Sequence, residues 1–301
     1  VAFLSTFARI NYNFRQKYFL DFTARGDASS NFGPNNKVGF FPTISGGWIM
    51  SDESWWFSKT INYFKLKAGW GVTGNADIPP YQYEGYASNS QNTYAGYPYI
   101  FPTSRENPDL KWETSNNFDA GIELGIAENR YLFELGYYNK QSSDILLNVN
   151  LPPSSGFSTY WTNVAKISNW GVELNFTARF IVQENFTWTS IFNTAHNRNK
   201  ITDIGNWSED AVSGGTNDTR VVVGEPVGTN FLVRFYGVDP ENGRPIYLDI
   251  DGNQTYDWDP KDRVPVGSVL PTVVGGWTNN FTWKNWSASL FINFSLGGNI
   301  Y

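Results

Sequence analysis

Alternation of apolar and polar residues with a period of two runs through most of the 301-residue chain, and it limits the fold more than any other feature. Every second side chain of a β-strand points to the same face, so this pattern is typical of strands with one apolar face. Five segments show it clearly: 4–14, 18–26, 118–126, 170–180 and 286–294. Five show it more weakly: 41–50, 62–72, 130–140, 185–195 and 273–283. Helical spacing is nearly absent, and the sequence therefore predicts an all-β, antiparallel fold with about ten strands.

The length and the connections of these segments indicate a membrane barrel. Their length exceeds the ~5–6 residues usual in soluble sheets and matches the ~9–11 that a tilted strand needs to cross a bilayer. Short connections join strands in pairs, at 15–17, 127–129, 181–184 and 284–285, with a longer turn at 51–61. Long connections separate the pairs, at 27–40, 73–117, 141–169 and 196–272. Outer-membrane barrels alternate short periplasmic turns with longer extracellular loops in this way.

Composition supports this class and excludes several others. The chain has 13 Trp, 17 Tyr and 23 Phe but only 17% charged residues, and aromatic residues gather near the short turns, as at Tyr12, Trp55 and Trp283. Interfacial aromatic girdles have this placement, although aromatic pairs across a soluble sheet are the alternative. A net charge of −6 speaks against nucleic acid as a partner. The absence of cysteine excludes thiolate metal sites and cysteine nucleophiles, and no nucleophile motif accompanies the single histidine, His196.

Tyrosine and tryptophan residues in the long connections are candidates for contacts with a ligand or a partner. A stretch rich in Tyr, Gly and Asn covers 81–101 and includes Tyr94 and Tyr97, while Trp161 and Trp207 lie in the next two long connections. Rigid aromatic side chains can stack on sugars or peptides at little cost in conformational entropy. The alternative is that these rings pack on one another and order the loops.

One acidic stretch has the spacing of a calcium loop. Asp249, Asp251, Asn253 and Asp257 occupy positions 1, 3, 5 and 9 of such a loop, and oxygen ligands at these positions suit Ca²⁺. Glycine is at position 4 rather than 6, and no glutamate follows at position 12. The alternative is a loop held by Asx-turns, so Ca²⁺ is a candidate ligand and not a required cofactor.

Several motifs resemble the SusC/RagA family of TonB-dependent outer-membrane transporters. They are RGDASSNFG at 25–33, GFFPTISGGW at 39–48, LKAGWGVTGN at 66–75, NPDLKWET at 107–114, YYNK at 137–140, NWGVE at 169–173 and the Asp249 loop with GSVLP at 267–271. These motifs occur in the order of the family and cover nearly the whole chain. Gln254 stands where the family usually has glycine, which weakens the calcium interpretation.

The resemblance implies a barrel of about 22 strands with a plugged lumen, of which residues 1–301 would be one part. The plug domain, the signal peptide and the last strands would then lie outside these residues. It also implies a transporter and not an enzyme, which imports glycan or peptide nutrients across the outer membrane of a Gram-negative, Bacteroidetes-like bacterium. The expected partners are a SusD-like surface lipoprotein that acts as a lid, and TonB-ExbB-ExbD, which would act through the missing N-terminal region.

Under this interpretation one face of the strands meets outer-membrane lipid and the other lines the lumen. The residues expected to meet lipid are Leu20, Phe22, Ile122, Leu124, Leu174, Phe176, Leu290 and Ile292. Two alternatives stay open on the residues alone: a soluble carbohydrate-binding β-sandwich, and a complete small outer-membrane porin. The identity of the substrate is not encoded in these patterns.

Overall fold

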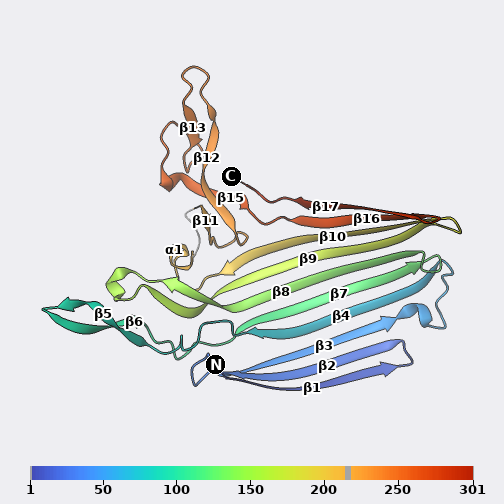
Figure 1. Ribbon diagram of the computed structural model, residues 1–301, viewed down its shortest axis with the longest axis horizontal. Coiled ribbons are helices and arrows are strands. Elements are labelled where there is room, and N and C mark those ends of the chain that lie inside the picture. The colour runs from blue at the N-terminus through green and yellow to red at the C-terminus, as the bar shows by residue number, and fades with distance from the viewer. Residues whose placement is uncertain (1, 214–217, 301) are drawn as a thin grey trace.

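One antiparallel sheet of ten strands dominates the computed structural model, which describes residues 2–213 and 218–300 (Figure 1). Its strands are β1 (Phe3–Phe14), β2 (Tyr18–Ser29), β3 (Val38–Ile49), β4 (Ile61–Asn75), β7 (Glu113–Ile126), β8 (Tyr131–Asn150), β9 (Thr159–Gln183), β10 (Phe186–Asp203), β16 (Val273–Trp283) and β17 (Trp286–Leu296). Each strand pairs with the next one in this order. All ten strands predicted from the alternation are confirmed, and so is the all-β, antiparallel class.

The short turns lie at one end of the sheet and the long connections at the other (Figure 1). Arg15 and Gln16, which join β1 to β2, both have positive φ, and so does Lys284 between β16 and β17. Left-handed turn residues fit tight hairpins because their twist matches that of the flanking strands. A 3₁₀ turn, Met50–Asp52, lies in the longer link between β3 and β4.

The long connections contain structure of their own. Between β4 and β7, strands β5 (Tyr86–Tyr94) and β6 (Tyr97–Ser104) form a separate hairpin. Between β10 and β16, a short helix α1 (Glu209–Val212) precedes a five-stranded sheet that projects from the main one (Figure 1). Its strands are β11 (Thr219–Arg220), β12 (Thr229–Val238), β13 (Pro245–Leu248), β14 (Gln254–Thr255) and β15 (Arg263–Ser268). Among the described residues, no helix is long and apolar enough to cross a membrane.

The connection predicted at 141–169 is wrong in extent, because β8 and β9 continue through most of it and leave 151–158 between them. A register shift falls between Ser142 and Ile145, and Asp144 there has positive φ. Beyond this bulge both faces of the hairpin are covered: Leu146 packs into one buried cluster and Val149 into another. A strand that is covered on both faces loses the period-two signal, so the alternation could not reveal this extension.

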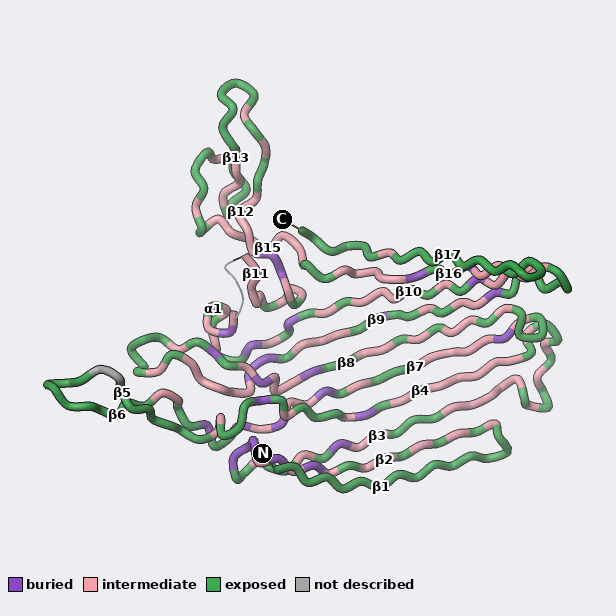
Figure 2. The backbone as a smooth tube through the Cα atoms, viewed as in Figure 1, coloured by how far each residue is buried: buried purple, intermediate pink, exposed green. Residues whose placement is uncertain are grey.

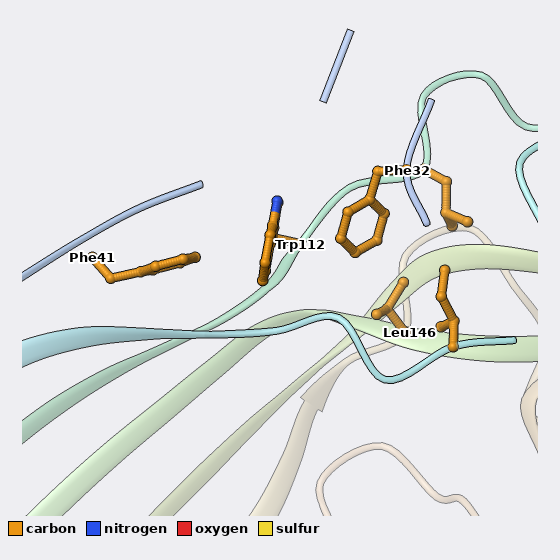
Figure 3. Packing of buried hydrophobic residues seen from close by; sticks show 6 residues of the cluster. Phe32, Phe41, Trp112 and Leu146 are labelled. Atoms are coloured by element: carbon orange, nitrogen blue, oxygen red, sulfur yellow. The ribbon is translucent and has the colours of Figure 1, made fainter. Parts of the chain in front are cut away.

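Two buried apolar clusters lie where the long connections meet the sheet, and Figure 2 shows most buried residues at this end. The first contains Phe32, Phe41, Ile78, Leu110, Trp112 and Leu146. Its centre is Trp112, whose ring lies between those of Phe32 and Phe41, with centroid distances of 5.2 and 5.3 Å (Figure 3). The second contains Val149, Val164, Ala165, Ile201, Ile204 and Val212. These clusters give the loops a core that is independent of the bilayer.

Asparagine side chains fasten the connections to one another. Asn163 donates to the carbonyls of Lys111 and Asp144 at 2.8 and 2.7 Å and accepts from the Lys111 amide at 2.9 Å. Asn107 donates to the carbonyl of Trp161 at 2.9 Å. Both amides satisfy backbone groups that loops would otherwise leave unpaired on burial. The NPDLKWET motif is therefore explained by side-chain packing and by hydrogen bonds to backbone groups of the loops.

Glycine at position 74 is expected to be required for the first cluster. A Cβ atom on Gly74 would lie 2.0 Å from the Phe41 ring, whereas one on Gly136 of β8 would meet nothing within 4 Å. We expect Gly74→Ala to lower the free energy of unfolding by about 1–3 kcal/mol, because the ring must move within a packed cluster. Urea unfolding in detergent, read by tryptophan fluorescence, measures this. Gly136→Ala is the matched control, and equal effects of the two changes would contradict the packing argument.

Candidate functional site

One face of the sheet is mainly apolar. Cross-strand partners share a face, and one continuous row of them is entirely apolar: Phe64, Leu124, Phe133, Phe176, Phe192, Trp277 and Ile292. The rings of Phe133 and Phe176 stack at 4.4 Å. We call this the apolar face. The eight residues predicted to meet lipid all lie on it, and Leu20, Phe22, Leu290 and Ile292 are exposed.

Aromatic side chains form a belt near the short turns. Tyr12, Phe14, Tyr18, Trp48 and Trp55 follow one another with ring centroids 6.1–6.3 Å apart. Further along the belt, the indoles of Trp188 and Trp277 donate to the buried side chains of Asn279 and Ser190 at 3.0 and 2.8 Å.

These two tryptophans satisfy the polar groups that lie on the apolar face, where no water would be available beneath lipid. Nothing in the sequence signalled these two pairs.

The opposite face, which we call the polar face, carries a connected group of charges. Lys67 contacts Glu123 at 3.0 Å and also forms an ion pair with Glu134, while Lys65 lies 3.8 Å from Glu123. The stem of Lys67 lies flat over the next strand, since a Cβ atom on Gly121 would be 2.9 Å from its Cε. Charges that lie along the wall leave a hollow of about 710 Å³ above it, lined by Asp21, Lys65, Lys67, Asp119, Glu134 and Glu173 among others.

The loop aromatics predicted as contacts lie in two different environments. Tyr94 and Tyr97 face each other across the tip of the β5–β6 hairpin and are 79% and 75% exposed. Trp161 belongs to β9 rather than to a loop and packs against the first cluster. Trp207 packs against the second cluster, with its ring 6.2 Å from that of Tyr160. Of these four side chains, only the two at the hairpin tip present most of their rings to solvent.

The acidic loop is held by hydrogen bonds within itself. The carboxylate of Asp249 accepts from the backbone and side-chain amides of Asn253 at 2.7 and 3.1 Å, and these donors lower the pKa of Asp249 below its usual 3.8. Asp251 and Asp257 are exposed on the same loop. Across residues 2–213 and 218–300, no three His, Cys, Asp or Glu side chains converge as a metal site. Calcium binding stays a prediction, and the Asx-turn accounts for the hydrogen bonds of Asp249.

A sheet with an apolar face, an aromatic belt near its short turns and a polar opposite face defines a transmembrane β-barrel of the outer-membrane type. Residues 2–301 match the family described as "TonB dependent receptor-like, beta-barrel". The chain belongs to this family, whose members lie in the bacterial outer membrane and act as transporters rather than enzymes. The polar face is thus the lumen side, and the apolar face meets lipid.

Relatives and solved structures agree with this assignment. TonB-dependent receptor P26 of Formosa agariphila is 32% identical over 99% of this chain and 32% of its own length. TonB-dependent receptor SusC of Bacteroides thetaiotaomicron is 33% identical over 99% of this chain and 31% of its own. The chain thus spans about a third of these relatives. The RagAB peptide transporter matches with a TM-score of 0.87 and 26% identity, over 98% of this chain and 33% of that one.

A more distant structure shares the fold alone. The siderophore receptor PirA from Acinetobacter baumannii matches with a TM-score of 0.50 and 14% identity, over 97% of this chain and 33% of that one. The matches to SusC and to RagAB confirm the resemblance to the SusC/RagA family.

An added positive charge should destabilise the protein on the apolar face and be tolerated on the polar face. Leu135 of β8 is exposed on the apolar face, and Asn175 of β9 lies on the polar face. We expect Leu135→Arg to destabilise the inserted protein by about 2–4 kcal/mol, because a cation would enter the hydrocarbon, and Asn175→Arg to have little effect. Unfolding titrations in lipid vesicles measure both. Equal tolerance of the two arginines would contradict the assignment of the faces.

The acidic loop offers a test that separates its two interpretations. Asparagine at position 249 can still accept from Asn253, whereas alanine cannot. We expect Asp249→Asn to resist limited proteolysis in this loop like the unchanged protein, with or without Ca²⁺, and Asp249→Ala to be cleaved faster. Because the pKa of Asp249 is lowered, its contribution is present above pH 3.8 and is lost only below it, so protection at pH 5 should equal that at pH 7. Protection that requires Ca²⁺ and is lost in Asp249→Asn would favour a metal site.

Proposed function

We propose that this chain is the barrel part of a TonB-dependent importer that carries oligosaccharides or peptides across the outer membrane. The observation that carries the proposal is the match of nearly the whole chain to SusC and to the RagAB peptide transporter, together with a polar, hollowed wall on the side that would be the lumen. Energy would come from TonB-ExbB-ExbD, acting on a region outside these residues.

The proposal treats the chain as about ten strands of a barrel with about 22. Strands β1 and β17 each pair on one side only within the described residues, and the relatives are about three times as long. These facts favour a part of a larger plugged barrel over a complete small porin. The soluble sandwich is disfavoured by the ten-stranded sheet, which is far wider than either sheet of a sandwich and has no second sheet of similar size packed against it within the described residues.

A surface lipoprotein of the SusD kind is the proposed partner on the loop side. The hairpin tip with Tyr94 and Tyr97 projects away from the sheet beside the other long connections (Figure 1). Exposed tyrosines supply large, rigid contact areas in protein interfaces. Trp161 and Trp207 would act in the same interface mainly by fixing the loop bases, since both rings pack against the buried clusters.

Import and lid binding can be tested together in the longer protein that carries this chain. We expect uptake of labelled oligosaccharides or peptides to be lost in cells without TonB. We expect the double change Tyr94→Ala and Tyr97→Ala to weaken co-purification of the lipoprotein at least about fivefold, because rings at interface centres carry much of the binding energy. Phe57→Ala changes an exposed ring at the short-turn end and is the control. Uptake that persists without TonB would contradict the importer proposal.

A further inference from the structure

A second hollow, separate from the ion-paired wall, opens at the loop end of the polar face. It has a volume of about 630 Å³ and lies against the ends of β2, β3 and β4 and the segment 76–78. The ladder between β3 and β4 stops at Thr43 and Gly71, so the two strands part beyond this point. The parted strands create the hollow at the end of the lumen wall that faces the outside of the cell.

The floor of this hollow is apolar and rigid. Phe41, Trp112 and Ile78 line it and belong to the first buried cluster. The tip of the Phe41 ring lies between Gly39 and Gly74, on either side of the gap, since Cβ atoms there would be 2.4 and 2.0 Å from it. The ring therefore covers the strand edge where β3 and β4 part. An extended peptide could not add to the sheet here, and recognition must use side chains.

An exposed aromatic ring stands at the rim. Phe3 of β1 lines the hollow, is 56% exposed, and packs edge-on against Trp112 with centroids 6.0 Å apart. Its partner across the ladder is Ser29, and Ser5, two residues further, pairs with Asp27, so Phe3 shares the polar face. A phenyl ring exposed on the lumen side gains nothing from lipid, and its free surface is suited to the C–H face of a ligand.

Oriented charge and hydroxyl groups complete the wall. Arg25 donates through Nε to both oxygens of Asp27, at 2.9 and 2.7 Å, and the Asp27 residue is only 5% exposed. This buried carboxylate fixes the guanidinium, which remains half exposed at the hollow. Donors that are oriented before binding lose less entropy when a ligand arrives.

The rest of the wall can both donate and accept. The lining includes three hydroxyls, from Thr23, Thr43 and Thr73. Asp77 also lines it, and within the part of the chain that the structure describes its carboxylate has no hydrogen-bond or ion-pair partner. A ligand that places many groups of mixed donor and acceptor character around an apolar centre would satisfy this wall.

We propose that this hollow is a binding subsite for one ring of an oligosaccharide. A sugar ring presents C–H groups on its faces and hydroxyls around its edge, which matches an aromatic rim with surrounding hydroxyl, carboxylate and guanidinium groups. The inference rests on the proposed import function and narrows its substrate to the glycan class. Phe3 supplies the stacking surface, and Arg25 and Asp77 bind hydroxyls from two sides.

Binding by the purified longer protein in detergent tests this subsite without any energy source. The probes are maltohexaose, cellohexaose, laminarihexaose, mannohexaose and hexagalacturonate, with a random hexapeptide mixture as the competing class. We expect at least one saccharide to bind, and Phe3→Ala and Asp77→Asn each to weaken it at least tenfold. Phe7→Ala is the matched control, because Phe7 is 72% exposed on the same face of β1 and does not line the hollow.

Three outcomes would overturn the subsite: no saccharide binds, saccharide binding is unchanged in both variants, or the variants lose peptide binding instead. Uptake of the bound saccharide by cells with and without TonB is measured alongside. Uptake that depends on TonB but is indifferent to Phe3 and Asp77 would remove the subsite and leave the importer. Saccharide binding that requires Phe3, together with uptake that does not depend on TonB, would support the subsite and contradict the importer.

Discussion

A backbone that crosses hydrocarbon must satisfy every N–H and C=O group from within the protein, and the rest of this structure depends on that constraint. Each of the ten long strands pairs with the long strand before and after it, apart from the outer edges of β1 and β17, and no crossover passes through the sheet. Pairing fixes the register, and the register fixes which side chains share a face. The row from Phe64 to Ile292 is therefore a consequence of backbone pairing as much as of composition.

Beyond the bilayer the same strands need other means of stabilisation, and the structure supplies them at the loop end. Water competes there for backbone groups, and the loops respond with buried apolar clusters and with asparagine amides such as that of Asn163. Trp112 contributes both apolar packing and a hydrogen bond to the backbone. Its ring packs between Phe32 and Phe41, and its indole donates to the carbonyl of Lys37 at 3.1 Å. The NPDLKWET motif, which contains Trp112, lies at this junction.

The sequence predicted the ten strands well because period-two alternation is strong wherever one face meets lipid and the other water. It failed beyond Asp144, where the bulge and burial on both faces remove that signal, and so it treated Trp161 as a loop residue. For the polar face, the sequence predicted only that its residues alternate with those of the apolar face. The contacts among Lys67, Glu123 and Glu134 join three strands, and a single strand's pattern contains no information about such contacts. The parting of β3 and β4, which forms the hollow at the loop end, depends likewise on pairing between strands.

Glycine shapes the wall of both hollows. Beside the hollow at the ion-paired wall, Gly121 lets the stem of Lys67 lie flat. Beside the hollow at the loop end, Gly39 and Gly74 leave room for the tip of the Phe41 ring. In each case the missing Cβ leaves room for a long side chain to lie against the sheet. The wall thereby keeps charged and aromatic groups within reach of a passing ligand while leaving space for it. A side chain larger than glycine at these positions would collide with the Lys67 stem or the Phe41 ring, and that group would have to move away from the wall.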